Sequence, residues 1–123
     1  YIYTNPLSVA DCAAAKAAAD VADSPEGLDR LANVRARIKQ FRDGLDTLGC
    51  ESIPGHHPVV PLMVRDTERT TRMVEGFGAN GVLVVGLNYP VVPMGNQTIR
   101  FQINAGHTEA DITEVLRVLR SLL

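Results

Sequence analysis

Six consecutive residues near the end of the chain alternate between apolar and polar side chains, and this feature constrains the fold more than any other. The apolar members are Ile99, Phe101 and Ile103, and the polar members are Arg100, Gln102 and Asn104. Successive side chains of a strand point to opposite faces of the sheet. The pattern therefore predicts a strand whose apolar face enters the core while its polar face lies outside it.

A long apolar stripe predicts the main helix of the chain. Ser24, Pro25 and Glu26 supply an N-cap, a proline at the first helical position and an acid in the first turn. Apolar residues then recur at spacings of three and four until Gly49 ends the helix, and they are Leu28, Leu31, Val34, Ile38, Phe41, Leu45 and Leu48. We expect a basic opposite face, which carries Arg30, Arg35, Arg37, Lys39 and Arg42.

Three further helices are predicted from composition and capping signals. Alanine dominates residues 7–23, which favours a helix that is buried or lies at an interface, because small side chains let another element approach closely. Asp66 caps a helix that stops at Asn80-Gly81. Thr108 and Asp111 resemble a capping box at the start of an amphipathic last helix.

Two short apolar runs, residues 59–64 and 82–85, are typical of strands buried on both faces. The proline-rich residues 88–95 lack backbone donors, so we expect an ordered loop or a sheet edge there. The element order is then helix, long helix, strand, helix, strand, strand, helix. This order predicts one domain over residues 1–123 with an α+β fold, in which helices pack on a three- to four-stranded, mainly antiparallel sheet.

Composition narrows the classes of partner. The chain has 123 residues and a formal net charge of −2, which gives no long-range attraction for nucleic acid or an acidic membrane. No apolar run approaches the roughly 20 residues that a bilayer crossing needs, and no signal-peptide pattern opens the chain. We therefore expect a cytoplasmic protein whose partners are small molecules and protein.

Neither zinc nor redox chemistry is expected, because Cys12 and Cys50 lie far apart with no CxxC motif or Cys/His cluster near them. The first residues, Tyr1-Ile2-Tyr3, have no initiator Met and are expected to form an apolar extended segment. We expect the chain to be a fragment of a longer protein.

Arg100 is the main candidate for chemistry, on the polar face of the predicted last strand. Its guanidinium on a stiff strand suits bidentate recognition of a carboxylate or phosphate, and the proline-rich loop before it suits a rigid wall beside such a site. The alternative is a polar sheet face that is simply solvated.

The other polar candidates favour structural roles. His56 and His57 are neighbours in a turn and are expected at the surface, and His107 is expected to fix the corner before the last helix. The two lysines, Lys16 and Lys39, lie in predicted helices with no reason for a depressed pKa. No catalytic residue and no metal ligand is therefore predicted.

Two motifs, taken together, resemble the α-oxoamine synthases. The first is the loop Tyr89-Pro90-Val91-Val92-Pro93-Met94-Gly95, and the second is Ile99-Arg100-Phe101-Gln102-Ile103-Asn104-Ala105-Gly106-His107-Thr108. Residues 53–61 also look like the start of the matching strand in glycine C-acetyltransferases (2-amino-3-ketobutyrate CoA ligases), a group within this family. The resemblance spans nearly the whole chain.

The resemblance implies the C-terminal small domain of a fold-type-I pyridoxal-phosphate enzyme that condenses a glycine-like amino acid with an acyl-CoA. In such an enzyme a large domain, absent from this chain, carries the cofactor on a lysine, and two subunits form a homodimer. Thr4 matches the residue whose hydroxyl meets the cofactor phosphate of the neighbouring subunit. Arg100 matches the residue that holds the carboxylate of the amino acid. The alternative function is a free-standing ligand-binding or dimerisation module without catalysis.

Overall fold

Contacts along the chain divide it into two units, Tyr1–Ala32 and Asn33–Leu123, in a computed structural model that describes residues 6–123. In the first unit, helix α1 (Val9–Ala22) begins at Ser8, whose side chain accepts a hydrogen bond from the Asp11 backbone. No α1 side chain is buried, so the alanine-rich helix does not form part of a core within this chain. Its role at an interface stays a prediction.

A tight turn joins α1 to the first turns of helix α2 (Pro25–Thr47). Ser24 caps α2 as predicted, since its hydroxyl accepts a hydrogen bond from the Gly27 backbone. The chain doubles back so closely that a Cβ on Gly27 would lie 2.4 Å from the carbonyl oxygen of Val21. A glycine is therefore required at this position.

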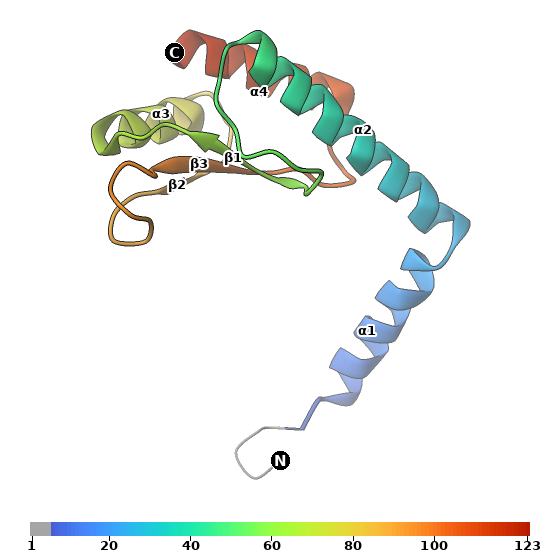
Figure 1. The fold of residues 1–123 in the computed structure, drawn as a ribbon. Helices are drawn as coiled ribbons and strands as arrows, with labels where there is room; N and C mark the ends of the chain where they lie inside the picture. The colour runs from blue at the N-terminus through green and yellow to red at the C-terminus, as the bar shows by residue number, and fades with distance from the viewer. Residues whose placement is uncertain (1–5) are drawn as a thin grey trace. The chain divides into compact units, whose positions relative to one another are not determined.

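The second unit is built on a small antiparallel sheet. Within residues 6–123 the sheet has three strands, β1 (Val59–Met63), β2 (Val85–Leu87) and β3 (Thr98–Gln102), in the order β1-β3-β2. The central strand β3 pairs antiparallel with both neighbours. Helices α2, α3 (Thr67–Ala79) and α4 (Glu109–Leu122) cover one face of the sheet, as Figure 1 shows. The predicted α+β fold and its element order are confirmed.

Aromatic contacts join the helices to the sheet. The ring of Phe101 on β3 lies 4.8 Å from that of Phe41 on α2 and 5.4 Å from that of Phe77 on α3, measured between centroids. Aliphatic side chains complete the core around these rings, and they are Ile38, Leu45, Val60, Leu62, Met73, Ile99, Ile103, Ile112, Val118 and Leu119. The predicted inward face of the last strand is thereby confirmed.

Two strand predictions were wrong in detail. Strand β1 is buried on one face only, because Val60 and Leu62 are buried while Pro61 and Met63 are half-buried. The run 82–85 is not a buried strand: Leu83 is 100% exposed, and strand β2 begins only at Val85, at the edge of the sheet. The first error arises because helices cover only one face of this sheet (Figure 1), and the second because the pairing with β3 begins only at Val85.

The helix boundaries agree with the capping signals. Asp66 caps α3, and Thr108 and Asp111 form a reciprocal capping box at α4. The predicted basic face of α2 is only partly solvated, since Arg37 and Arg42 are half-buried and donate hydrogen bonds to Gln40 and to the Ile53 carbonyl.

Within residues 6–123, no helix combines the length and apolarity that a membrane crossing requires.

Candidate functional site

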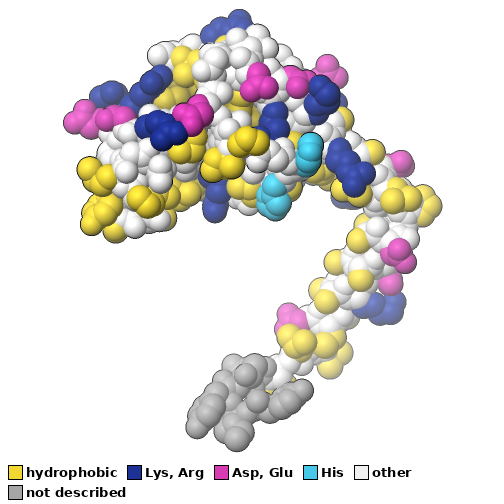
Figure 2. Space-filling model, viewed as in Figure 1, with side chains coloured by type: hydrophobic (Ala, Val, Ile, Leu, Met, Phe, Trp, Pro, Cys, Tyr) yellow, Lys and Arg dark blue, Asp and Glu magenta, His cyan; other side chains and the backbone are white. Residues whose placement is uncertain are grey.

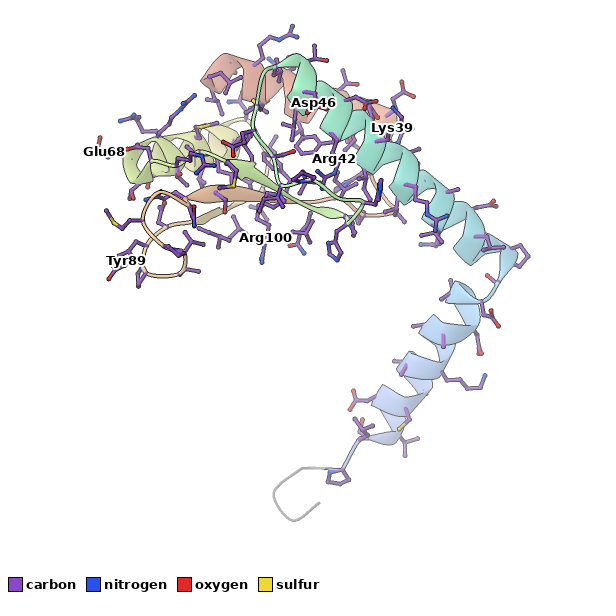
Figure 3. All side chains as sticks on the ribbon, viewed as in Figure 1. Lys39, Arg42, Asp46, Glu68, Tyr89 and Arg100 are labelled. Carbon is purple, nitrogen blue, oxygen red and sulfur yellow. The ribbon has the colours of Figure 1, made fainter. Side chains whose placement is uncertain are left out.

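Arg100 occupies the centre of the sheet face that the helices leave open. Its neighbours across the sheet are Pro61 on β1 and Val85 on β2, and the next row along the same face is Met63, Thr98 and Leu87. Figure 3 shows Arg100 on the side of the sheet away from α2 and α4. A single cation is thus flanked on both sides by apolar side chains.

A cavity of about 430 Å3 lies against this face. Arg100 and Thr98 belong to its lining, and apolar residues from four segments supply most of the rest: Ile53, Pro61, Met63, Leu87, Val92 and Pro93. The predicted wall formed by the proline-rich loop is therefore present beside Arg100.

The guanidinium of Arg100 lacks a partner within the part of the chain that the structure describes. Its Nε is buried and makes no hydrogen bond. A buried donor of a charged group that stays unpaired is costly. The Nε atoms of Arg37 and Arg42 are also buried without a partner, but those side chains donate through Nη1 to Gln40 and to the Ile53 carbonyl, whereas the Arg100 side chain makes no hydrogen bond among the described residues. The arrangement suits an anion with two oxygens, either a carboxylate or a phosphate, that enters from the cavity.

The polar residues that follow Arg100 do not join it. Strand β3 ends at Gln102, and Gln102 and Asn104 border a different cavity, of about 360 Å3, together with His107 and Asp111. Asn104 is instead a corner residue, whose Oδ1 accepts from the Gly106 backbone while its own backbone N–H donates to His107 Nδ1. His107 thus has the structural role predicted for it, and the polar stripe splits into an Arg100 site and a corner.

A buried glutamine holds the proline-rich loop in place. The Gln97 side chain accepts from the Gly95 backbone at 3.0 Å and donates to Thr67 Oγ1 at 3.1 Å. The backbone carbonyl of Gln97 accepts hydrogen bonds from the backbone N–H groups of Val64 and Arg65, each at 2.9 Å. The role of Gln97 was not predicted from the sequence, because an isolated glutamine after a proline-rich stretch has no periodic signature.

The outer side of this loop is apolar. Tyr89, Val91 and Met94 are exposed. Figure 2 shows apolar side chains gathered at the lower left, where Figure 1 places the loop between β2 and β3. The loop therefore has one side toward the Arg100 cavity and one side that no part of residues 6–123 covers.

Three groups outside the cavity lining, Cys50, Glu51 and Arg65, have shifted pKa values. Hydrogen bonds from Arg65 lower the pKa of the Glu51 carboxyl, and those to Glu51 raise the pKa of Arg65. Burial raises the pKa of the Cys50 thiol, which is the direction for a structural rather than a reactive cysteine.

The remaining predicted residues lie apart from the site. Lys16 and Lys39 are exposed and paired with Asp20 and Asp43 on their own helices, and His56 and His57 are exposed. Among residues 6–123 there is no group of three His, Cys, Asp or Glu side chains that could hold a metal. Thr4, the predicted contact to the cofactor phosphate, lies outside the described residues, as do Tyr1, Ile2 and Tyr3.

Curated relatives match nearly the whole chain. The chain is 35% identical over 119 residues to the 8-amino-7-oxononanoate synthase of Marinobacter nauticus, covering 97% of this chain and 30% of that protein. It is 32% identical over 112 residues to the mitochondrial 2-amino-3-ketobutyrate coenzyme A ligase of Homo sapiens, covering 91% of this chain and 26% of that protein. The chain thus spans less than a third of the length of these relatives.

Solved structures show the same fold at lower identity. A serine palmitoyltransferase from S. paucimobilis with bound PLP superposes with a TM-score of 0.73 at 22% identity, covering 78% of this chain and 25% of that chain. The 8-amino-7-oxononanoate synthase of Francisella tularensis gives a TM-score of 0.65 at 20% identity, covering 76% and 27%. The α+β fold is therefore one found in fold-type-I pyridoxal-phosphate enzymes.

The family model described as aminotransferase class I and II matches residues 1–119, nearly the whole chain. Both curated relatives named above are α-oxoamine synthases, so the resemblance carried by the loop and the last strand is confirmed. The chain therefore belongs to the aminotransferase class I and II family, in which its relatives are α-oxoamine synthases.

Proposed function

We propose that this chain is the closing domain of a pyridoxal-phosphate-dependent C-acyltransferase that condenses a glycine-like amino acid with an acyl-CoA. The observation that carries the proposal is the buried, unpartnered Nε of Arg100 beside a largely apolar cavity. An amino acid brings a carboxylate to such a site, and the planar guanidinium fork matches its two oxygens. The names of the curated relatives support the same class of substrates.

Each part of the site has a distinct task in this proposal. Arg100 binds and orients the carboxylate of the amino acid. Pro61, Met63 and the loop residues Val92 and Pro93 exclude water from that ion pair, which strengthens it. The amino group of the bound amino acid then points away from the sheet, toward the part of the enzyme outside this chain.

Pyridoxal phosphate supplies the electron sink for the carbanion chemistry when it is bound. We propose that residues outside this chain hold most of it and that Thr4 offers a hydroxyl to its phosphate in a neighbouring subunit of a homodimer. The described residues fit the end of that arrangement that binds the substrate. Among them, the positively charged guanidinium of Arg100 has no partner for its Nε and lies in a largely apolar cavity wall. The chain alone is expected to be inactive.

The test compares Arg100→Ala and Arg100→Lys with the unmodified full-length enzyme by calorimetric titration. Glycine carries the carboxylate, and methylamine is the matched ligand that lacks it. Loss of a charge-assisted bidentate contact is expected to cost about 2 to 4 kcal/mol of glycine affinity, with partial recovery in Arg100→Lys, whereas methylamine affinity stays unchanged. An Arg72→Ala variant on the exposed side of α3 serves as the control.

Equal loss for both ligands would assign Arg100 a structural role. No loss for either ligand would leave it a solvated residue. Both results contradict the proposed function.

A further inference from the structure

Arg65 has a backbone conformation that side-chain-bearing residues rarely adopt. Its φ is +64°, and it is the one non-glycine residue with positive φ within residues 6–123. This left-handed conformation is unfavourable for a residue with a Cβ and persists where surrounding contacts over-determine it. The contacts that Arg65 makes are therefore expected to hold its backbone in this conformation.

The side chain of Arg65 joins two segments that are far apart in sequence. Its Nε donates to Glu51 Oε2 at 2.9 Å, and Nη2 donates to the other oxygen of the same carboxylate. Its Nη1 donates to the carbonyl of Gly95 at 3.2 Å. The backbone N–H of Arg65 adds a bond of 2.9 Å to the carbonyl of Gln97.

Both segments line the Arg100 cavity. Glu51 belongs to a short stretch that pairs with the outer edge of β1, and Ile53 of that stretch is part of the cavity lining. Gly95 belongs to the loop that contributes Val92 and Pro93 to the same lining. One guanidinium thus bridges the segment that carries Ile53 and the loop.

We propose that Arg65 is a positioning residue for the Arg100 cavity, because it ties the 51–53 segment to the 88–96 loop and so sets the width of the space above Arg100. The role of the cavity as a substrate site rests on the proposed function. The tie itself rests on the three contacts of the guanidinium. When the tie is removed, the loop and the 51–53 segment separate and the carboxylate of a bound amino acid meets Arg100 less often in the productive geometry.

The structure contains a matched control for an ordinary surface ion pair. Arg117 and Glu114 on α4 also form a two-point pair, with Nε to Oε2 at 2.7 Å and Nη2 to Oε1 at 2.6 Å. The side-chain exposures are 61% and 51% for that pair, against 51% and 58% for Arg65 and Glu51. Arg117 and Glu114 belong to one helix and take no part in lining the Arg100 cavity.

The experiment uses the full-length enzyme with Arg65→Ala, Arg65→Gly, Arg65→Lys and Arg117→Ala. Glycine and methylamine are titrated by calorimetry, and kcat and KM for glycine are measured with acetyl-CoA. Hydrogen exchange of residues 91–97 is followed by mass spectrometry. Arg65→Gly keeps the left-handed backbone without strain and removes only the side chain, so it answers the question even if Arg65→Ala fails to fold.

In Arg65→Ala and Arg65→Gly we expect glycine affinity to fall about tenfold, methylamine affinity to change less, and exchange of residues 91–97 to accelerate. KM for glycine rises while kcat at saturation stays within about twofold, because the lost interaction is made equally in the ground and transition states. Arg65→Lys recovers part of the affinity, since it keeps the charge without the fork. A merely structural role would lower the active fraction without changing the preference for glycine over methylamine.

If both Arg65 variants match Arg117→Ala in glycine affinity, the positioning role is wrong, even where Arg100→Ala shows that the proposed function holds. If Arg100→Ala itself leaves glycine affinity unchanged, the proposed function fails. The tie is then judged by hydrogen exchange alone, and unchanged exchange of residues 91–97 in Arg65→Gly overturns it.

Discussion

At the scale of single residues, Arg42 takes over a hydrogen bond that a proline cannot make. Ile53 and Pro61 face each other at the outer edge of β1, where the Ile53 backbone donates to the Pro61 carbonyl at 3.3 Å. An antiparallel pair of this kind normally exchanges two bonds, but Pro61 has no N–H to return. Arg42 Nη1 reaches from α2 and donates to the Ile53 carbonyl at 2.8 Å instead. Figure 3 shows Arg42 between α2 and the sheet.

We predict that Arg42→Ala lowers the free energy of unfolding by about 1 kcal/mol, because the Ile53 carbonyl loses its charged donor. The loss of unfolding free energy is expected to be smaller in a Pro61→Ala background. There the residue at position 61 has a backbone N–H that can donate to the Ile53 carbonyl in place of Arg42. Urea unfolding of the two single variants and the double variant measures this coupling. Equal cost of Arg42→Ala in both backgrounds would show that Arg42 stabilises by packing and not through this carbonyl.

The site residues differ in how far the sequence reveals them. Arg100 was predicted because strict alternation places it opposite the apolar side chains of a strand. Arg65 and Gln97 were not predicted, because their roles depend on contacts with Glu51, Gly95 and Thr67. The fold brings these partners together from distant parts of the sequence, so no local sequence pattern predicts the contacts.

At the scale of elements, a side chain of α4 packs directly on α2 at Gly44. A Cβ on Gly44 would lie 2.3 Å from Leu116 Cδ1, so the side chain of Leu116 occupies the space that the glycine leaves. Glycine in a helix interior lowers helix stability, but at this position its missing side chain makes room for Leu116. The packing of Leu116 on α2 therefore depends on one small residue.

We predict that Gly44→Ala destabilises the protein by about 1 kcal/mol, since overpacking against Leu116 exceeds the gain in helix propensity. Gly78→Ala on α3 is the matched control, because nothing lies within 4 Å of its added Cβ. The control is expected to be neutral or stabilising by up to about 1 kcal/mol. Thermal unfolding of both variants checks the prediction, and stabilisation by Gly44→Ala would show that Leu116 moves aside freely.

The elements with their own periodic or capping signals were predicted well. The two amphipathic helices, α3 and α4, begin at the predicted caps, and β3 has its predicted inward face. Strand β2 was misplaced because its apolar run starts several residues before the pairing does. Val85 lies opposite Arg100 on the open face, and only the pairing with β3 decides which residues of the run become a strand.

At the scale of the whole molecule, several large apolar side chains are exposed among the residues that the structure describes. They lie on the loop, at Tyr89, Val91 and Met94, and around α1, at Leu7, Val9 and Val21. Exposed apolar groups of this size usually mark a contact with another protein surface. In the proposed function, the rest of the enzyme and the second subunit cover them.

We predict that the isolated 123-residue chain self-associates or is poorly soluble, because association removes this apolar surface from water. Light scattering over a series of concentrations is the measurement, with a Val91→Ser, Met94→Ser variant expected to associate less. A constant monomer mass at every concentration would contradict the prediction. Equal association of the variant would place the contact at α1 or elsewhere instead of at the loop.

The central position of β3 separates two functions of the site. Arg100 is held by hydrogen-bonded neighbours on both sides and by the packed Phe101 beneath it, whereas most of the lining around it comes from edge segments and a loop. Substitutions in the loop can therefore change the shape of the cavity while Arg100 keeps its position on β3. In the proposed function, such changes alter which amino-acid side chains fit. In the proposed function, the contact with the carboxylate and the choice of substrate then belong to different parts of one small sheet, the central strand and the loop beside it, which differ in their freedom to change.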